Sequence, residues 1–161
     1  MIDINKKVTL KNLTNWALTF KRINSLGDII IPPNGKFTML AEEVMSQIYN
    51  NNRLFVGDDG KGSHARIFIE DEDIRLEAEF ENKQSKKGQD ILTNEKLKEL
   101  FALKLLTSFK KNIQEKIKSQ AEKSKVIEYA KTIKLNDHDK IEFLEKYTGY
   151  KLENAFRNSK S

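Results

Sequence analysis

Apolar and polar residues alternate along the first half of the chain, which is the pattern of strands covered on one face. This alternation predicts strands in VTLKNLT (8–14), WALTFKRI (16–23), DIII (28–31), KFTML (36–40), LFVG (54–57), HARIFIE (64–70) and IRLEAEF (74–80). The PPNG sequence at 32–35 predicts a turn, because proline fixes φ and Asn-Gly reverses the chain readily. Helical spacing occurs once in this half, in AEEVMSQIYNN (41–51). Coverage on one side favours an antiparallel sheet or small β-sandwich over a parallel α/β core.

Helical spacing dominates the second half, where apolar residues recur every three or four positions. We expect one long helix from Thr93 or Asn94 to about residue 118, a second over about 120–134, and a third over about 137–147. Asn136 or Asp137 is expected to cap the third helix, and Gly149 to end it.

The two patterns together predict an α+β protein. An N-terminal antiparallel β-sheet or small β-sandwich with one short helix is expected over residues 1–81, followed by a C-terminal three-helix segment over 93–150. The polar stretch at 82–92 is the expected linker, and the polar tail at 151–161 is expected to be frayed.

The apolar stripe of the long helix narrows after Leu106. Phe109, Ile113 and Ile117 form a single line at intervals of four among lysines. Such a line suits an outer helix, or one that completes its packing against another subunit.

Charge divides unevenly between the halves. The net charge is +5, but residues 1–81 carry 10 Lys+Arg against 13 Asp+Glu, and residues 82–161 carry 19 against 11. The resulting net charges of −3 and +8 suggest two surfaces with different partners, or one positive surface that meets an acidic neighbour. The absence of cysteine excludes disulfides and thiolate metal sites, and neither a secretory signal nor a membrane span is expected.

The stretch FVGDDGKGSHARIFIED (55–70) is the most chemically suggestive part of the chain. A phosphate loop is disfavoured because Lys61 precedes a glycine and a strand pattern instead of Ser or Thr and a helix. A calcium loop lacks alternating oxygen ligands, and His64 as a catalytic base lacks an evident nucleophile and orienting partner. A hairpin connection fits the residues better, and its exposed side chains Asp58, Asp59 and Lys61 are candidate partner contacts.

Other chemical clusters have structural explanations. EDED (70–73) is interpreted as a solvated turn, and Asp137 in Asp-His-Asp (137–139) as a helix cap. No three nitrogen or carboxylate ligands converge, so neither a metal nor a cofactor is expected and the chain is not expected to be an enzyme. For Trp16 we expect core packing, with an interface anchor as the alternative.

Lysines are the remaining candidates. Lys104, Lys111 and Lys118 are seven residues apart and would share one helix face. A solvated face, contact with an acidic protein and nucleic-acid binding are all compatible with them. Interspersed acids, the lack of arginine in the lysine-rich region before Arg157 and the lack of aromatic residues among the lysines disfavour nucleic acid.

In layout the chain resembles small structural and accessory proteins of tailed bacteriophages that infect low-G+C hosts, such as adaptor and ring proteins. The resemblance lies in a β-rich start with VTLKNLTNWALTFKRI, the GDDGKGS loop and a lysine-rich helical end. It implies a non-catalytic virion component that assembles with other protein subunits as a homo-oligomer or larger assembly, in the virion or the host cytoplasm. The Phe109, Ile113 and Ile117 stripe would then be buried between subunits. The alternative is a phage-type regulator or inhibitor that binds nucleic acid, or a nucleic-acid enzyme, through the basic helices.

Overall fold

The computed structural model describes residues 2–84 and 89–152 of the chain. The protein is α+β, with antiparallel strands in its first part and helices in its second, as predicted. It divides into two compact units, Met1–Ile91 and Leu92–Ser161, which are called the β unit and the helical unit below. In the expected linker, Gln89, Ile91 and Leu92 are buried, while residues 85–88 lie outside the described residues. The expected frayed tail lies outside them from residue 153 onward.

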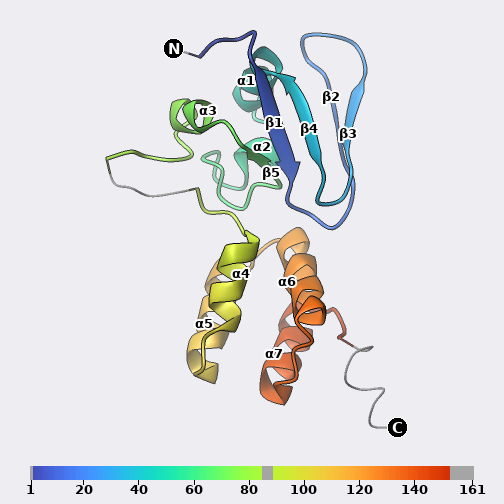
Figure 1. The fold of residues 1–161 in the computed structure, drawn as a ribbon, viewed down its shortest axis with the longest axis vertical. Helices are drawn as coiled ribbons and strands as arrows, with labels where there is room; N and C mark the ends of the chain where they lie inside the picture. Colours follow the sequence, from blue (N-terminus) through green and yellow to red (C-terminus); the bar gives the residue numbers. More distant parts are fainter. Residues whose placement is uncertain (1, 85–88, 153–161) are drawn as a thin grey trace. The chain divides into compact units, whose positions relative to one another are not determined.

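The β unit contains two small antiparallel sheets. Strand β1 (Lys7–Asn12) lies between β4 (Lys36–Leu40) and β5 (Ile67–Ile69) in the first sheet (Figure 1). Strands β2 (Leu18–Lys21) and β3 (Asp28–Ile31) form a hairpin that is the second sheet. The strands predicted before residue 41 are therefore confirmed: β3 and β4 have the predicted bounds, whereas β1 and β2 are shorter than predicted.

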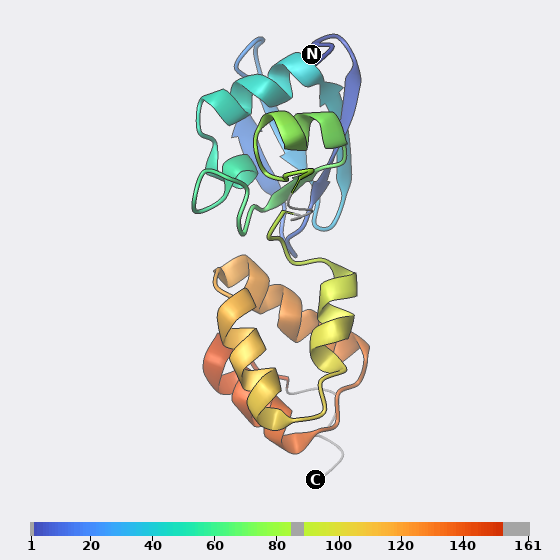
Figure 2. The same cartoon turned by 90° about the vertical axis from the view of Figure 1, so that its left-hand side faces the viewer.

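Three helices cover one face of these strands (Figure 2). They are α1 (Ala41–Tyr49), α2 (Arg53–Val56) and α3 (Glu72–Glu77). The alternation of the strands accounts for the core, because one side chain in two points toward the helices. The largest fully buried side chains of this core are Leu10, Ile29, Ile31, Phe55, Ile67, Ile69 and Ile74.

Two predicted strands are helices instead, and a third is short. LFVG forms most of α2, whose start is capped by the Asn52 side chain, and IRLEAEF follows a cap provided by Asp71. Both caps accept a main-chain N–H of the first turn, which satisfies a donor that a helix leaves unpaired. A short apolar run fits the spacing of a helix and of a strand equally well. Here the capping side chains Asn52 and Asp71 favour the helix. In HARIFIE only Ile67–Ile69 is strand.

The buried side chain of Asn12 fixes where the hairpin begins and ends. Its Nδ2 donates to the carbonyl oxygens of Trp16, Ile31 and Pro32 at 2.8, 3.1 and 3.0 Å. Its Oδ1 accepts from the main-chain N–H and the hydroxyl of Thr14, at 2.8 and 2.7 Å. The Asn12 amide thus forms hydrogen bonds with both segments that link the β2–β3 hairpin to the first sheet, the one that precedes β2 and the one that follows β3.

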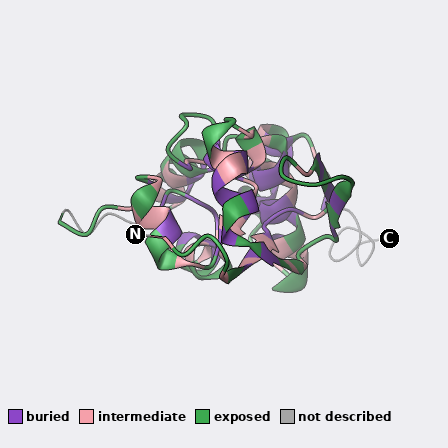
Figure 3. Ribbon diagram, turned by 90° about the horizontal axis from the view of Figure 1, so that it is seen from above, coloured by how far each residue is buried: buried purple, intermediate pink, exposed green. Residues whose placement is uncertain are grey.

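The helical unit contains four helices among its described residues. They are α4 (Asn94–Phe101), α5 (Leu106–Lys116), α6 (Gln120–Thr132) and α7 (His138–Thr148). Thr93 caps α4 and Asp137 caps α7, and Gly149 ends α7 in the left-handed region at φ 80°. The predicted start of the first helix and both ends of the last are confirmed. In Figure 3, buried (purple) and exposed (green) residues follow one another along the same strands and helices.

The prediction of one long helix to residue 118 is wrong, because the chain leaves helical geometry between Phe101 and Leu106. The interruption has nearly the length of one helical turn, about 3.6 residues, so the apolar spacing stays in phase across it. The Lys140 ammonium fills the break, where it donates to the carbonyl oxygens of Phe101 and Leu103 at 3.5 and 2.8 Å.

Candidate functional site

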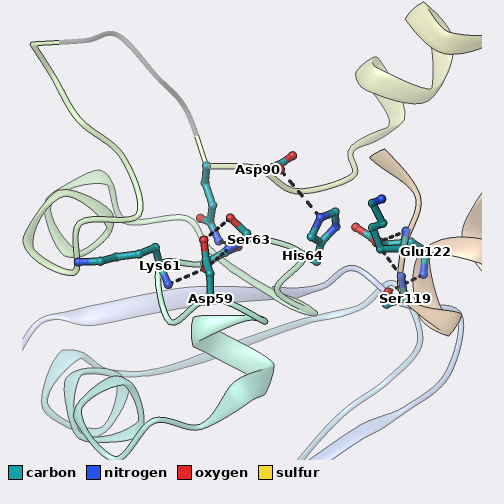
Figure 4. Close-up of polar contacts among 10 residues, drawn as sticks. Asp59, Lys61, Ser63, His64, Asp90, Ser119 and Glu122 are labelled. Carbon is teal, nitrogen blue, oxygen red and sulfur yellow. Dashed lines mark hydrogen bonds and ion pairs between the residues drawn. The ribbon is translucent and has the colours of Figure 1, made fainter. Parts of the chain in front are cut away.

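The glycine-rich loop at 57–64 is an ordered structure built around Asp59. The Asp59 carboxylate accepts from the main-chain N–H of Lys61 at 2.7 Å, and from the N–H and hydroxyl of Ser63 at 3.2 and 2.7 Å (Figure 4). Burial raises the pKa of Asp59, but these donors stabilise the carboxylate more, so its pKa lies below the ordinary value. The loop joins helix α2 to strand β5, which corrects the expected hairpin between two strands.

Two glycines allow the loop to fold this tightly. A Cβ on Gly57, at φ 71°, would lie 2.1 Å from the carbonyl oxygen of Ser63. A Cβ on Gly62, at φ 85°, would lie 2.6 Å from Nε2 of Gln89, whose amide donates to the Gly62 oxygen at 2.9 Å. Gly57 and Gly62 therefore serve close packing.

His64 also has a structural place. It lies at φ 59°, its main-chain N–H donates to the Asp90 oxygen at 2.8 Å, and its side chain is 13% exposed. Its Nε2 is 3.9 Å from Oδ2 of Asp90. The neighbouring Ser63 hydroxyl donates to the Asp59 carboxylate at 2.7 Å.

Asp58, Asp59 and Lys61, the loop's candidate contact residues, are all exposed. Lys61 forms an ion pair with Glu79, and the hydrogen bond from this ammonium lowers the pKa of the Glu79 carboxyl. Asp59 is engaged within the loop. A partner that meets this loop would therefore meet a preformed surface.

The three lysine candidates are also exposed, but they do not share one helix. Lys104 lies in the break between α4 and α5, Lys111 lies in α5, and Lys118 follows its end. Phe109, Ile113 and Ile117 differ from the expectation, because all three are fully buried in the core of the helical unit itself. The stripe is therefore that of an outer helix whose narrow apolar line is buried within its own unit, with Phe109 packed against Phe101 of α4 and Phe143 of α7. Its expected burial between subunits is wrong.

Aromatic residues do stand among the lysines in three dimensions. The rings of Phe143 and Tyr147 stack with centroids 5.7 Å apart, and Lys110 and Lys123 lie over them at 5.7 and 5.2 Å. The sequence argument that no aromatic residue accompanies these lysines is therefore wrong. It missed them because both rings come from α7, which is distant in the sequence.

A cavity in the β unit, which we call the edge slot, was not anticipated. It has a volume of about 470 Å³ and lies between the β2–β3 turn and the segment where β4 runs into α1. The cationic residues Lys7 and Arg22 line it, together with Thr38, Leu40 and Glu42. The sequence assigned none of these residues to a site, because their proximity depends on segments that are distant in the sequence.

Glu43 holds one wall of the edge slot in place. Its buried carboxylate accepts from the main-chain N–H groups of Ile23 and Asn24, at distances of 2.9 to 3.1 Å, and from Nε2 of Gln47 at 3.0 Å. The sequence suggested only a favourable interaction with the helix dipole for this residue. The N–H groups of Ile23 and Asn24 both bond to the carboxylate of Glu43, which belongs to α1. These bonds therefore hold the β2–β3 turn against α1.

Large apolar side chains project from the same hairpin into solvent. Leu26 is 97% exposed at the turn and Ile30 is 61% exposed on the outer face of β3. Ile23 and Leu40 are also exposed. Trp16, for which core packing was expected, is exposed as well.

Comparison of the chain with protein-family models, with curated proteins and with solved structures gave no match. Over residues 2–84 and 89–152, no helix is both long and apolar enough to cross a membrane. Within the same residues, no three His, Asp or Glu side chains gather as a metal site would require.

Proposed function

We propose that this chain is a non-catalytic assembly protein, a bacteriophage virion component of the adaptor or ring type that works through protein–protein contacts. The observation that carries the proposal is the set of exposed aliphatic side chains on the β2–β3 hairpin. Isolated apolar residues are common on protein surfaces, but a nearly fully exposed leucine close to other exposed aliphatic residues is typical of an interaction site.

The hairpin presents these side chains on a rigid support. Ile30 lies opposite Thr19 in the register, on the face away from the core. The turn is closed by a hydrogen bond from the Arg22 N–H to the Gly27 oxygen at 3.0 Å, and Glu43 anchors it to α1. Little ordering entropy is then lost when a partner covers Leu26 and Ile30, and burial of each contributes about 1.5–3 kcal/mol.

Light scattering after size-exclusion chromatography, over a range of concentrations, tests this proposal. We expect the chain to form an oligomer, and we expect Leu26→Ser with Ile30→Thr to shift it to the monomer without loss of the circular dichroism spectrum. The matched control Thr19→Ser lies opposite Ile30 and should leave assembly unchanged. Antibody labelling of purified phage particles tests the virion assignment. A strict monomer that no particle contains would overturn the proposal.

The stacked Phe143 and Tyr147 rings beside Lys110 and Lys123 favour a second candidate, which is nucleic-acid binding by the helical unit. Lysines that neutralise phosphates release counterions, so such binding weakens steeply as salt rises. Single-stranded DNA titrated at several salt concentrations tests this, with Lys110→Gln and Lys111→Gln against the control Lys98→Gln on α4. Binding without salt dependence, or equally affected by the control, would exclude this candidate.

A further inference from the structure

Strand β4 leaves one edge of the first sheet open. It is the end strand in the order β4-β1-β5, and its pairing with β1 is antiparallel. The hydrogen bonds from Ala41 N–H to the Lys6 oxygen and from Asn12 N–H to the Gly35 oxygen fix the alternation of the ladder. Residues 37 and 39 therefore bond to β1, while Thr38 and Leu40 direct their main-chain groups away from it.

Three main-chain groups are consequently available on this edge. The Leu40 carbonyl belongs to the N-cap of α1, which leaves the Leu40 N–H and both groups of Thr38. Within the part of the chain that the structure describes, no hydrogen bond reaches these three groups. Both residues line the edge slot.

The β2–β3 hairpin does not pair with the open edge of β4, because the main-chain groups at the end of β2 bond to α1. The Lys21 oxygen accepts from Nε2 of Gln47 at 2.7 Å, and Glu43 binds the N–H groups of Ile23 and Asn24. These bonds tie the hairpin to α1 instead of β4. The slot that remains has a volume within the range of ligand-binding sites, about 300–1,000 Å³.

Two cationic and two acidic side chains line the slot. Among the described residues, no acid lies within ion-pair distance of the Lys7 ammonium or the Arg22 guanidinium. Glu43 is buried, where its carboxylate accepts from several N–H groups, whereas Lys7 and Glu42 are exposed and Arg22 is half-buried. On the accessible part of the slot, Lys7 and Arg22 therefore outnumber Glu42.

We propose that the edge slot binds an extended, acidic peptide segment of a partner protein, which joins the first sheet as a strand beside β4. Its main chain bonds to Thr38 and Leu40, and an acidic side chain meets Lys7 and Arg22. This inference rests on the proposed function only in taking the partner to be a protein.

Other occupants use less of the site. A free carboxylate or phosphate would satisfy the cations and leave the strand edge unpaired. A second copy of the chain would bring Lys7 and Arg22 against their own equivalents, and like charges face to face are unfavourable.

The first experiment screens a display library of random peptides with the full chain as bait. We expect enrichment of peptides that combine β-branched residues with Asp or Glu. Amide hydrogen exchange with the best synthetic peptide should slow at Thr38 and Leu40 by about tenfold or more, because these amides gain partners. The amides of Phe37 and Met39 already belong to the ladder and should not change. A peptide N-methylated at alternate residues should not bind.

Charge-reversed variants test the recognition of the acid. We expect Lys7→Glu and Arg22→Glu each to weaken peptide binding about tenfold or more, and the control Lys21→Glu, outside the slot, to change it little. Thr38→Pro removes one edge donor and should also weaken binding. If that variant does not fold, the N-methylated peptide tests the same bond.

Several results would overturn the inference. These are enriched peptides without acids, protection of amides elsewhere, binding of inorganic phosphate alone, and a dimer that Thr38→Pro dissociates. The two proposals can fail separately. If the chain assembles but no peptide is enriched, the edge-slot proposal is wrong and the assembly proposal stands. If a peptide binds but the chain is a strict monomer that no particle contains, the assembly proposal is wrong and the edge-slot proposal stands.

Discussion

The buried ammonium of Lys140 donates a hydrogen bond to the main-chain oxygen of Leu103 over 2.8 Å. The same nitrogen lies 4.9 Å from the centroid of the Phe109 ring. A lysine of α7 thus binds a carbonyl of the break between α4 and α5, and it does so over an aromatic face that favours a cation.

Replacing this lysine should destabilise the helical unit. Lys140→Met keeps the length of the side chain but leaves buried carbonyl oxygens without a donor, so we expect the free energy of unfolding to fall by about 2 kcal/mol. Urea denaturation followed by circular dichroism measures the change. Lys146→Met, on the exposed face of the same helix, is the control and should cost less than about 0.5 kcal/mol. Equal losses in both variants would contradict this role of Lys140.

The two adjacent aspartates of the 57–64 loop should differ in their effect on stability. Asp59→Ala removes the acceptor of three hydrogen bonds, so we expect a loss of about 1–3 kcal/mol in the free energy of unfolding. Asp58→Ala removes an exposed carboxylate and should change stability by less than about 0.5 kcal/mol. Thermal unfolding of both variants makes the comparison. A larger effect at Asp58 would show that Asp59 does not organise the loop.

Two glycines of this loop offer a similar contrast. Gly60 has a positive φ of 76° but open space around it, so Gly60→Ala should cost only the conformational strain, about 1–2 kcal/mol. Gly62→Ala adds contacts of 2.6 Å with Gln89 and 2.9 Å with Phe80, so we expect a clearly larger loss of stability. Chemical denaturation of the two variants measures the difference. Indistinguishable losses would mean that the loop adjusts to the added methyl group.

Alkaline pH should destabilise the protein through Tyr147. Burial, assisted by the negative charge of Glu122, raises the pKa of this phenol, and its hydroxyl donates to the Ile117 oxygen at 2.6 Å. The folded state therefore favours the protonated form, and its contribution is complete below the unfolded pKa of about 10. The free energy of unfolding should fall as pH rises beyond that value. In Tyr147→Phe this fall should be smaller, and an unchanged profile would contradict the assignment.

The sequence predicted well those elements whose signals are local. The first two strands follow from alternation and the next two from the PPNG turn between them. Thr93, Asp137 and Gly149 were recognised because caps act on neighbouring residues. The segments at 54–57 and 74–80 were wrong because a few apolar residues fit both periods. There the capping side chains Asn52 and Asp71 carried the deciding signal, and it was not used.

The candidate sites were harder to predict because they depend on contacts distant in the sequence. The stripe from Phe109 to Ile117 looked narrow on its own helix, yet other helices cover it completely. The edge slot exists because Glu43 ties a distant turn to α1, and no pattern in either segment indicates this contact. Spacing along a chain predicts which face of an element a residue occupies, but not what lies opposite.

Ile91 and Leu92 are neighbours whose side chains belong to different cores. Ile91 packs with Leu13 and Ala65, whereas Leu92 packs within the helical unit. Just before them, Gln89 donates to the Gly62 oxygen and the Asp90 oxygen accepts from the His64 N–H. A fragment that ended in the polar stretch near residue 84 would lack these two hydrogen bonds, and without Ile91 it would expose Leu13. Anyone who wishes to express the two units separately should therefore cut the gene between codons 91 and 92.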